Sequence, residues 1–346
     1  MPTSGAERPV YSLVIPIFNE EAVLPVLLHR LDALLAKLDG PAEIIIVDDG
    51  SRDTGSILAA ARARDDTRYR YLALSRNFGH QVAITAGMDV ARGDAIVIMD
   101  ADLQDPPEVV LDLVAKWREG YEIVYARRLS REGETRLKLW TAGLFYRLLR
   151  TLTAVEIPEN VGDFRLVDRK AVDAFRAMPE RDRFVRGMFG WLGFRQTAVS
   201  FHRASRAAGQ TRYGWAKMVR LAFDGIVSFS DAPLRLALWL GGAVSLCSLA
   251  FGGWVVWQSL HQAGFVSGWA STVVLLSLLS GVNLLMTGIV GLYVGRIHSE
   301  VKHRPLYVVG RAVGFDEGDM AEAAPPLRPG ARDLVTLRHP ALRAAR

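Results

Sequence analysis

The chain has 346 residues, half of them hydrophobic, and a formal net charge of +5. That length permits one large domain or two modest ones, and the single cysteine, Cys247, excludes an internal disulfide. The first residues lack signal-peptide character, so we expect the N-terminal domain to stay in the cytoplasm.

Residues 10–126 alternate between strand and helix patterns. We predict strands at 10–15, 43–47, 71–74, 94–99 and 122–125, and helices at 20–38, after Asp53-Thr54, at 81–91 and at 107–117. Pro16 is expected to end the first strand. Such alternation predicts an α/β fold with a mostly parallel, doubly wound sheet. Ligands of such sheets bind beyond the carboxyl ends of the strands.

Polar clusters follow four of these strands, at residues 19–20, 48–49, 76–77 and 100–102. In the last cluster, Asp100 and Asp102 alternate along an extended chain, so both carboxylates can face one point, and Gln104 adds a third oxygen. Hard oxygen ligands at this spacing suit Mg²⁺ or Mn²⁺, which can hold a diphosphate. The alternative is a solvated acidic turn.

Two long apolar runs, Leu236–Leu260 and Phe265–Gly295, carry no charge and are each long enough to span a bilayer. The alternative is a pair of buried core helices. Basic residues precede the first run and follow the second, whereas the short linker has no Lys or Arg, which predicts a hairpin with both termini in the cytoplasm. Basic amphipathic helices are expected at 137–152 and 215–226, either on lipid headgroups or packed on the sheet.

These patterns divide the chain into five parts. We expect an N-terminal tail at 1–9, an α/β domain at 10–203, a juxtamembrane amphipathic segment at 204–233, a two-helix transmembrane hairpin at 234–297 and a cytoplasmic C-terminal tail at 298–346. The tail is expected to be disordered from about residue 316, because it is rich in Ala, Pro and Arg and has no periodic apolar face.

Four motifs stand in order along residues 10–310: Pro16-Ile17-Phe18-Asn19-Glu20, Val47-Asp48-Asp49-Gly50-Ser51, Asp100-Ala101-Asp102-Leu103-Gln104 and Gly162-Asp163-Phe164-Arg165. With these motifs the chain resembles family 2 glycosyltransferases of the glycosyltransferase A fold. Within that family it is similar to the membrane-anchored polyprenyl-phosphate glycosyltransferases.

The resemblance implies a role for each matching position. Pro16, Phe18, Glu20 and Asp49 would line the nucleotide-sugar site, and Arg128 would contact phosphate, although the adjacent Arg127 leaves that alignment open by one residue. Metal and diphosphate would be bound by Asp100, Asp102 and Gln104. Asp163 would stand near the acceptor with Arg165 beside it, so the catalytic set is Asp100, Asp102, Asp163 and Arg165.

The acceptor phosphate is expected at basic residues next to the membrane: Arg203, Arg206 and Arg212. Relatives often carry a Ser-Lys pair where this chain has Thr211-Arg212, but arginine can also grip phosphate. The signature of processive synthases, Gln-x-x-Arg-Trp, is absent from the sequence, which argues against polymer extrusion.

The resemblance implies inverting, metal-dependent transfer of one sugar from a nucleotide donor to polyprenyl phosphate at the inner membrane. The cofactor would be Mg²⁺ or Mn²⁺. The alternatives are a transferase acting on another lipid and a non-catalytic membrane scaffold that keeps the fold. No nucleic-acid partner is expected. Glycines in the second apolar run, Gly291 and Gly295, share one helix face and favour a homo-oligomer.

Overall fold

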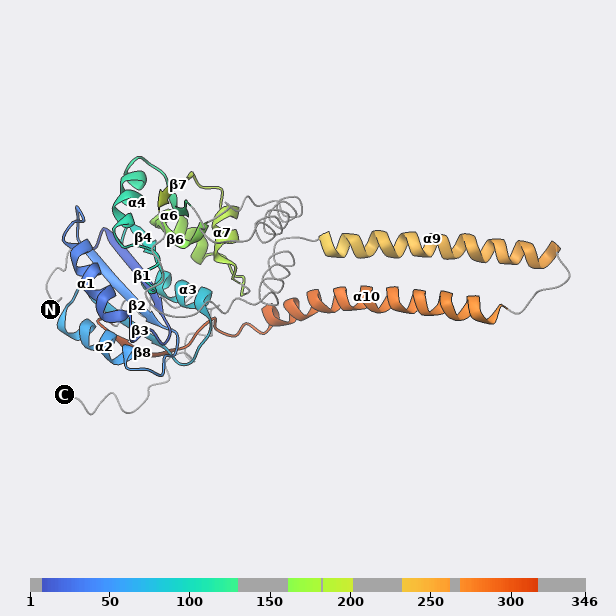
Figure 1. The fold of residues 1–346 in the computed structure, drawn as a ribbon, viewed down its shortest axis with the longest axis horizontal. Coiled ribbons are helices and arrows are strands. Elements are labelled where there is room, and N and C mark those ends of the chain that lie inside the picture. The colour runs from blue at the N-terminus through green and yellow to red at the C-terminus, as the bar shows by residue number, and fades with distance from the viewer. Residues whose placement is uncertain (1–7, 130–160, 182, 202–231, 262–267, 317–346) are drawn as a thin grey trace.

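The structure is a computed structural model that describes residues 8–129, 161–181, 183–201, 232–261 and 268–316. An α/β domain carries two long helices that extend away from it side by side (Figure 1). The amphipathic helices predicted at 137–152 and 215–226 lie outside the described residues.

One eight-stranded sheet forms the centre of the domain, in the order β7-β5-β6-β4-β1-β2-β3-β8. Its strands are β1 (Tyr11–Ile17), β2 (Ala42–Asp48), β3 (Tyr69–Leu74), β4 (Ala95–Ile98), β5 (Ile123–Arg128), β6 (Val161–Asp168), β7 (Gln196–Phe201) and β8 (Val309–Val313). Neighbouring strands are parallel except where β6 meets β4 and β5, and where β8 meets β3. The prediction of a mostly parallel sheet is therefore confirmed.

Helices cover both faces of this sheet. One core cluster joins the sheet to α1 (Leu24–Leu35), α2 (Gly55–Asp65) and α4 (Val109–Arg118). The other joins it to α3 (His80–Val90), α6 (Arg169–Arg176) and α7 (Val185–Trp191). The sheet is doubly wound, as predicted.

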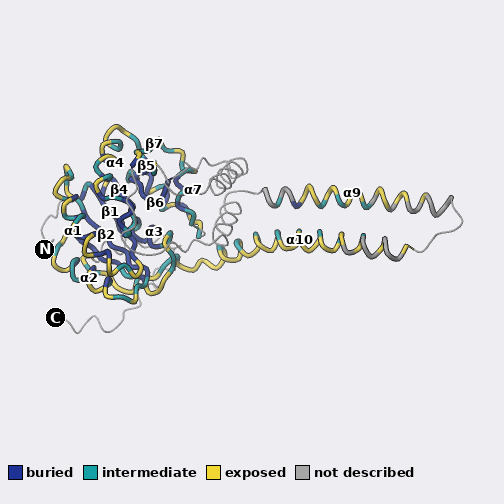
Figure 2. Tube along the Cα trace, viewed as in Figure 1, coloured by how far each residue is buried: buried dark blue, intermediate teal, exposed yellow. Residues whose placement is uncertain are grey.

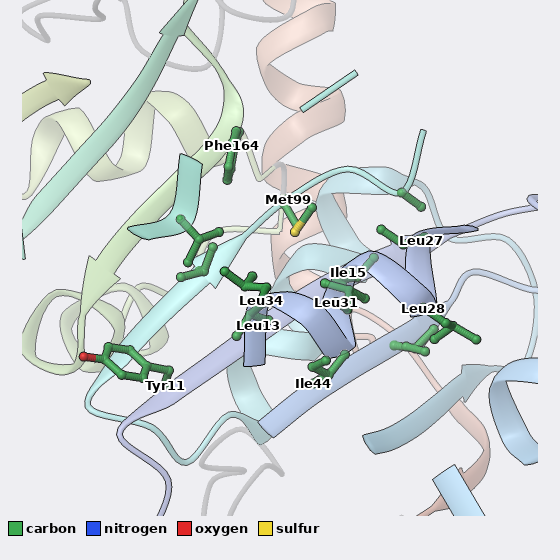
Figure 3. Packing of buried hydrophobic residues seen from close by; sticks show 14 of the residues in the cluster. Tyr11, Leu13, Ile15, Leu27, Leu28, Leu31, Leu34, Ile44, Met99 and Phe164 are labelled. Atoms are coloured by element: carbon green, nitrogen blue, oxygen red, sulfur yellow. The ribbon is translucent and has the colours of Figure 1, made fainter. Parts of the chain in front are cut away.

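The first core cluster shows how sequence period becomes packing. In α1 the buried leucines recur every three or four residues, so they form one stripe that faces β1 (Figure 3). Pro25 lies in the first turn, where its missing N–H costs no helical hydrogen bond. Leu31 packs with Leu13 and Ile15, and burial of each such side chain contributes about 1.5–3 kcal/mol.

The prediction that Pro16 ends the first strand is wrong, because β1 continues to Ile17. The reason lies in the side of the strand toward which the backbone nitrogen of Pro16 points. Two residues earlier, the Val14 carbonyl accepts a hydrogen bond from the Met99 N–H at the end of β4. Pro16 faces the same side, but β4 has already ended at Ile98, so a ring without N–H breaks no ladder bond there.

The two long helices are α9 (Ala232–His261) and α10 (Trp269–Val301). Within the described residues, only Leu278–Val301 is both long and apolar enough to cross a membrane, whereas the apolar part of α9 is the shorter Ala237–Ser248. The described side chains of both helices are mostly exposed (Figure 2). A helical pair is thus present, and its membrane insertion as a two-span hairpin stays a proposal.

The strand β8 has no counterpart among the predicted elements, since residues 298–346 were expected to form a tail. It follows α10 and pairs antiparallel with β3, with Tyr71 opposite Val313. The segment before it is also fixed, because the Tyr307 hydroxyl donates to Asp89 Oδ2 of α3 at 2.9 Å. Residues 307–313 therefore pack as part of the α/β domain.

Candidate active site

The polar clusters converge at the edge of the sheet where the parallel strands end. After β1, the Asn19 side chain accepts a hydrogen bond from the Arg52 N–H (3.0 Å), and the Asn19 N–H donates to Ser51 Oγ (3.0 Å). After β2, the Asp49 carboxylate accepts from the N–H groups of Phe78 and Gly79 at 2.7 and 2.9 Å. These bonds fix the loops after β1, β2 and β3 to one another.

Gly50 makes this convergence possible. Its φ of +79° lies in the left-handed region, and a Cβ at this position would stand 2.6 Å from the carbonyl carbon of Arg76. No side chain fits so close to another backbone. The loop after β2 therefore requires glycine here in order to approach the loop after β3.

Asp100 and Asp163 meet because of strand register. In the antiparallel pair of β4 and β6, Ile98 lies opposite Arg165, which brings Asp100, just beyond β4, across from Asp163. The pairing of β5 with β6 is irregular between Tyr125 and Arg127, as at a β-bulge. Bulges are common beside active sites, where they re-aim a side chain.

The Asp163 carboxylate is surrounded by donors from two helices. Arg186 of α7 binds both its oxygens, with Nε 2.8 Å from Oδ1 and Nη2 3.1 Å from Oδ2. From the start of α3, Gln81 Nε2 donates to Oδ2 at 3.2 Å, and His80 Nε2 lies 3.3 Å from the same oxygen. Burial alone would raise the pKa of Asp163, but the hydrogen bond with His80 and the charge and hydrogen bonds of Arg186 hold it well below the ordinary value.

His80 connects Asp163 with the predicted metal ligands. Its Nε2 also lies 3.3 Å from Asp100 Oδ1, so one imidazole bridges carboxylates that follow β4 and begin β6. Burial would lower the pKa of His80, and the two carboxylates outweigh that effect and raise it. The side chain remains 44% exposed, so it borders the open side of this edge.

The donor set after β4 fits a hard divalent cation. Asp100 Oδ1 is buried and accepts no hydrogen bond from the described residues. Burial, opposed by the charge of His80 and aided by the nearby charges of Asp105, Asp163 and Asp102, raises the pKa of Asp100 to about 6. Within the described ranges, no group of three or more His, Cys, Asp or Glu side chains is arranged to bind a metal ion. A cation here would therefore need further ligands from water or substrate.

The two predicted arginines have different surroundings. Arg165 is fully buried, and its guanidinium donates to the backbone carbonyls of Gly162 (3.0 Å) and Asp163 (3.2 Å). It thus supports the backbone that carries Asp163 and forms no ion pair at the surface with any described residue. Arg128 Nη2 lies 3.3 Å from Asp105 Oδ1, and a Cβ on Gly162 would come within 2.9 Å of that nitrogen.

The remaining predicted residues divide into two groups. Phe18 is 45% exposed and Glu20 is partly exposed, next to the loop after β1, whereas Pro16 and Asp49 are buried. The backbone N–H of Gln104 donates to Asp102 Oδ1. The acceptor-phosphate set lies outside the described residues: Arg203, Arg206 and Arg212. Three residues of this site are not among the predicted ones: His80, Gln81 and Arg186. Only His80 and Gln81 had a signal in the sequence, because they closely follow the polar cluster after β3.

The protein is of the doubly wound α/β class, whose ligands, nucleotides among them, bind beyond the carboxyl ends of the strands. The profile of Glycosyl transferase family 2 matches residues 12–176, which span this edge of the sheet. The chain is 45% identical to the glycosyltransferase YkcC of Bacillus subtilis (strain 168), over 88% of this chain and 95% of that protein. It belongs to glycosyl transferase family 2.

Two further comparisons add detail. The chain is 39% identical to the bactoprenol glucosyl transferase of Shigella phage SfV, over 86% of this chain and 97% of that protein. The resemblance to the polyprenyl-phosphate group of this family is thereby supported as well. Among solved structures, glucosyl-3-phosphoglycerate synthase from Mycobacterium tuberculosis overlaps with a TM-score of 0.45 at 22% identity, covering 64% of this chain and 80% of that one.

Proposed function

We propose that this chain transfers one sugar from a nucleotide-sugar donor to polyprenyl phosphate, with inversion, at the cytoplasmic face of the inner membrane. The observation that carries the proposal is the near full-length similarity to a bactoprenol glucosyl transferase. Glucose is therefore the first sugar to test. The site adds a physical reason, because Asp100, which we assign to the donor side, and Asp163, which we assign to the acceptor side, both lie 3.3 Å from His80 Nε2.

On the donor side, the leaving group would be a nucleoside diphosphate. Asp100 and Asp102, with Gln104, would hold a Mg²⁺ or Mn²⁺ ion, which when bound supplies Lewis-acid stabilisation of the developing charge. Arg128 would add positive charge beside the diphosphate. The loops that Asp49 holds together would receive the nucleoside, with Phe18 and Glu20 at their border.

On the acceptor side, a lipid phosphate is already anionic near neutral pH and needs positioning more than deprotonation. Asp163 is a poor base for such a step, since its partners keep it as a carboxylate with little tendency to take up a proton. An oxygen of the phosphate would attack the sugar carbon opposite to the departing diphosphate, so one displacement would invert the configuration. We assign Asp163 a positioning role in this step.

The membrane arrangement is part of the proposal. The apolar stretch Leu278–Val301 would cross the bilayer, α9 would form the second span, and both termini would lie in the cytoplasm. Arg203, Arg206 and Arg212 would then stand at headgroup depth beside the phosphate of the acceptor.

The test is a transfer assay with purified full-length protein in lipid nanodiscs, undecaprenyl phosphate, Mg²⁺ or Mn²⁺, and radiolabelled UDP-, GDP- or dTDP-glucose. We expect labelled lipid to form with one of these donors, to vanish in excess chelator and to return with added metal. Diacylglycerol in place of undecaprenyl phosphate tests the other lipid class. Nucleotide binding without transfer to any lipid would favour the scaffold alternative, and full activity in chelator would overturn the metal assignment.

A further inference from the structure

A closed ring of hydrogen bonds joins Asp163 to the start of α7. Arg186 contacts Asp163 through two nitrogens. The residue before it, Val185, donates its backbone N–H to Gln81 Oε1 at 3.2 Å, and Gln81 Nε2 returns to Asp163 Oδ2 at 3.2 Å. One glutamine amide therefore fixes both the carboxylate and the first residue of the helix that carries Arg186.

The same segment is attached to the end of α10. The Arg181 N–H donates to Glu300 Oε1 at 2.8 Å, and Glu300 is the penultimate residue of α10. Only five positions separate Arg181 from Arg186. Hydrogen bonds at both ends of this short segment thus connect the end of the apolar helix, through Arg181, with the Asp163 carboxylate, through Arg186.

We propose that Arg186 is a positioning residue of the transfer reaction, which fixes Asp163 in front of the acceptor and conveys to it the placement of the end of α10. This inference rests on the proposed function, because it presumes an acceptor that approaches from the membrane side.

Arg186 carries this role better than the other arginine nearby. The closest contact of Arg165 with the Asp163 carboxylate is 3.5 Å, and its shorter bonds go to backbone carbonyls. Arg186 makes two short, near-parallel bonds to the carboxylate, which fix its plane as well as its position. Its side chain is 32% exposed whereas that of Asp163 is 6% exposed, so Arg186 lies between the carboxylate and solvent.

The role of α10 follows from chain geometry. A shift of Glu300 would pull on the Arg181 N–H and so on the start of α7, where the Arg186 fork must meet Asp163 within hydrogen-bond distance. A displacement of about 1 Å at a reacting centre can cost about 100-fold in rate. A lipid acceptor enters from the bilayer. An active site held in a fixed position relative to the end of a membrane helix would keep Asp163 at a constant depth relative to the bilayer.

The first experiment measures kcat and both KM values in nanodiscs with undecaprenyl phosphate and whichever glucose nucleotide the wild type uses. In Arg186→Ala we expect kcat/KM for the lipid to fall about 100-fold while the donor KM changes less than about 2-fold. Arg186→Lys should recover part of the loss, since the charge remains but the fork does not. Unfolding temperatures verify that each variant folds. In a folded Arg186→Ala protein, a donor KM that rises as much as the lipid KM, or an unchanged lipid KM and kcat, would overturn the proposal.

A double-mutant cycle tests whether Arg186 acts through Asp163. If it does, Arg186→Ala combined with Asp163→Asn should be little worse than the more impaired single variant. Strictly multiplicative losses would show that the two residues act independently and would overturn the positioning role.

A third comparison tests the path from α10. Glu300→Ala removes the oxygen that binds the Arg181 N–H and should reproduce part of the Arg186→Ala defect in lipid kcat/KM. Glu300→Gln keeps an acceptor oxygen and Arg181→Ala keeps the backbone donor, so both should resemble the wild type. Normal kinetics in Glu300→Ala would remove α10 from the proposal. An inactive wild type would instead refute the proposed function, so the two failures are distinguishable.

Discussion

The Asp163 carboxylate accepts hydrogen bonds from Gln81 of α3 and Arg186 of α7. A group held in this way is a fixed negative charge and a poor proton acceptor, because protonation would break contacts with cationic partners. Asp100, only one strand away, has its pKa raised to about 6 by burial and neighbouring carboxylates. Two carboxyl groups at one edge of the sheet thus have opposite electrostatic surroundings.

Asp102→Ala removes a hard oxygen from the predicted metal site without disturbing the core, since the side chain is only partly buried. We expect turnover to fall at least ~100-fold, about 2.7 kcal/mol of transition-state stabilisation, with little change in unfolding temperature. Steady-state kinetics with varied Mg²⁺ or Mn²⁺ provides the measurement. Glu119→Ala, which removes a carboxylate that pairs with Lys116 on the surface, is the matched control. Wild-type turnover in Asp102→Ala would remove this residue from the site.

Gly50→Ala places a methyl group against the backbone of Arg76, at a φ of +79°. We expect a loss of about 1–3 kcal/mol in the free energy of unfolding and weaker nucleotide binding, because the loops after β2 and β3 must separate. Chemical denaturation and calorimetry with UDP and GDP measure the two effects. Gly79→Ala is the comparison, since Gly79 also has a positive φ but a Cβ there meets nothing within 4 Å. If Gly50→Ala and Gly79→Ala weakened nucleotide binding equally, backbone strain alone would explain the loss, and the close approach of Gly50 to Arg76 would not contribute.

At the scale of elements, the predictable parts are those that a short window encodes. The leucine spacing of α1 and the apolar runs of β2 and β4 stand in the sequence, and the structure has these elements within a few residues of their predicted bounds. By contrast, β8 is five residues long with a glycine and an arginine inside it, and it forms by pairing with β3. Its environment includes contacts such as that of Arg70 with the Gly314 carbonyl, 244 positions apart. No local window contains that information.

The site follows the same division. The Asp100-x-Asp102 spacing is local and could be recognised, and so could the cluster after β2. The bridge from Asp100 through His80 to Asp163 depends on the register of β4 against β6 and on where α3 begins. Arg186 reaches Asp163 only because α7 packs on the same face of the sheet as α3. These contacts join residues that are far apart in the sequence, so they form only when the fold is packed.

The segment that follows α10 introduces a pH dependence. Burial raises the pKa of Asp89 to about 6, although the Tyr307 hydroxyl and the charge of Arg176 oppose this. The unfolded chain would release the proton near pH 4, so between about pH 4 and 6 the folded protein binds more protons, and its free energy of unfolding falls as pH rises. Asp89→Asn removes the titrating carboxyl group and with it this dependence of stability on pH. We expect the variant to gain up to about 3 kcal/mol relative to wild type between pH 4 and 7.

Urea unfolding in detergent across that pH range measures the difference. Asp112→Asn, which neutralises an exposed carboxylate on α4, controls for a change in net charge. A constant difference between Asp89→Asn and wild type across the range would mean that Asp89 does not titrate with folding.

At the scale of the whole molecule, α10 presents an open glycine face. A Cβ on Gly288, Gly291 or Gly295 would meet no atom of the described residues within 4 Å. Small residues on a membrane helix let another helix approach closely. We therefore expect self-association through α10, and Gly291→Leu should weaken the oligomer without preventing membrane insertion.

Light scattering of the detergent-solubilised protein over a range of concentrations tests this expectation. Val290→Leu adds side-chain volume at the adjacent position and should leave the oligomer intact. A wild-type monomer at every concentration would refute the prediction.

The order of strands has a mechanical consequence. The chain leaves the sheet from β7, one outer strand, and after α10 it returns to β8, the outer strand on the opposite side. The chain therefore connects the helical pair to both outer strands of the sheet, whereas a terminal anchor would have a single connection to the domain. Two connections restrict the rotation of a domain about its anchor more than one connection does. With the helical pair in the bilayer, as proposed, the domain would have a narrower range of orientations toward the membrane, where a water-borne sugar donor and a lipid-borne phosphate must meet.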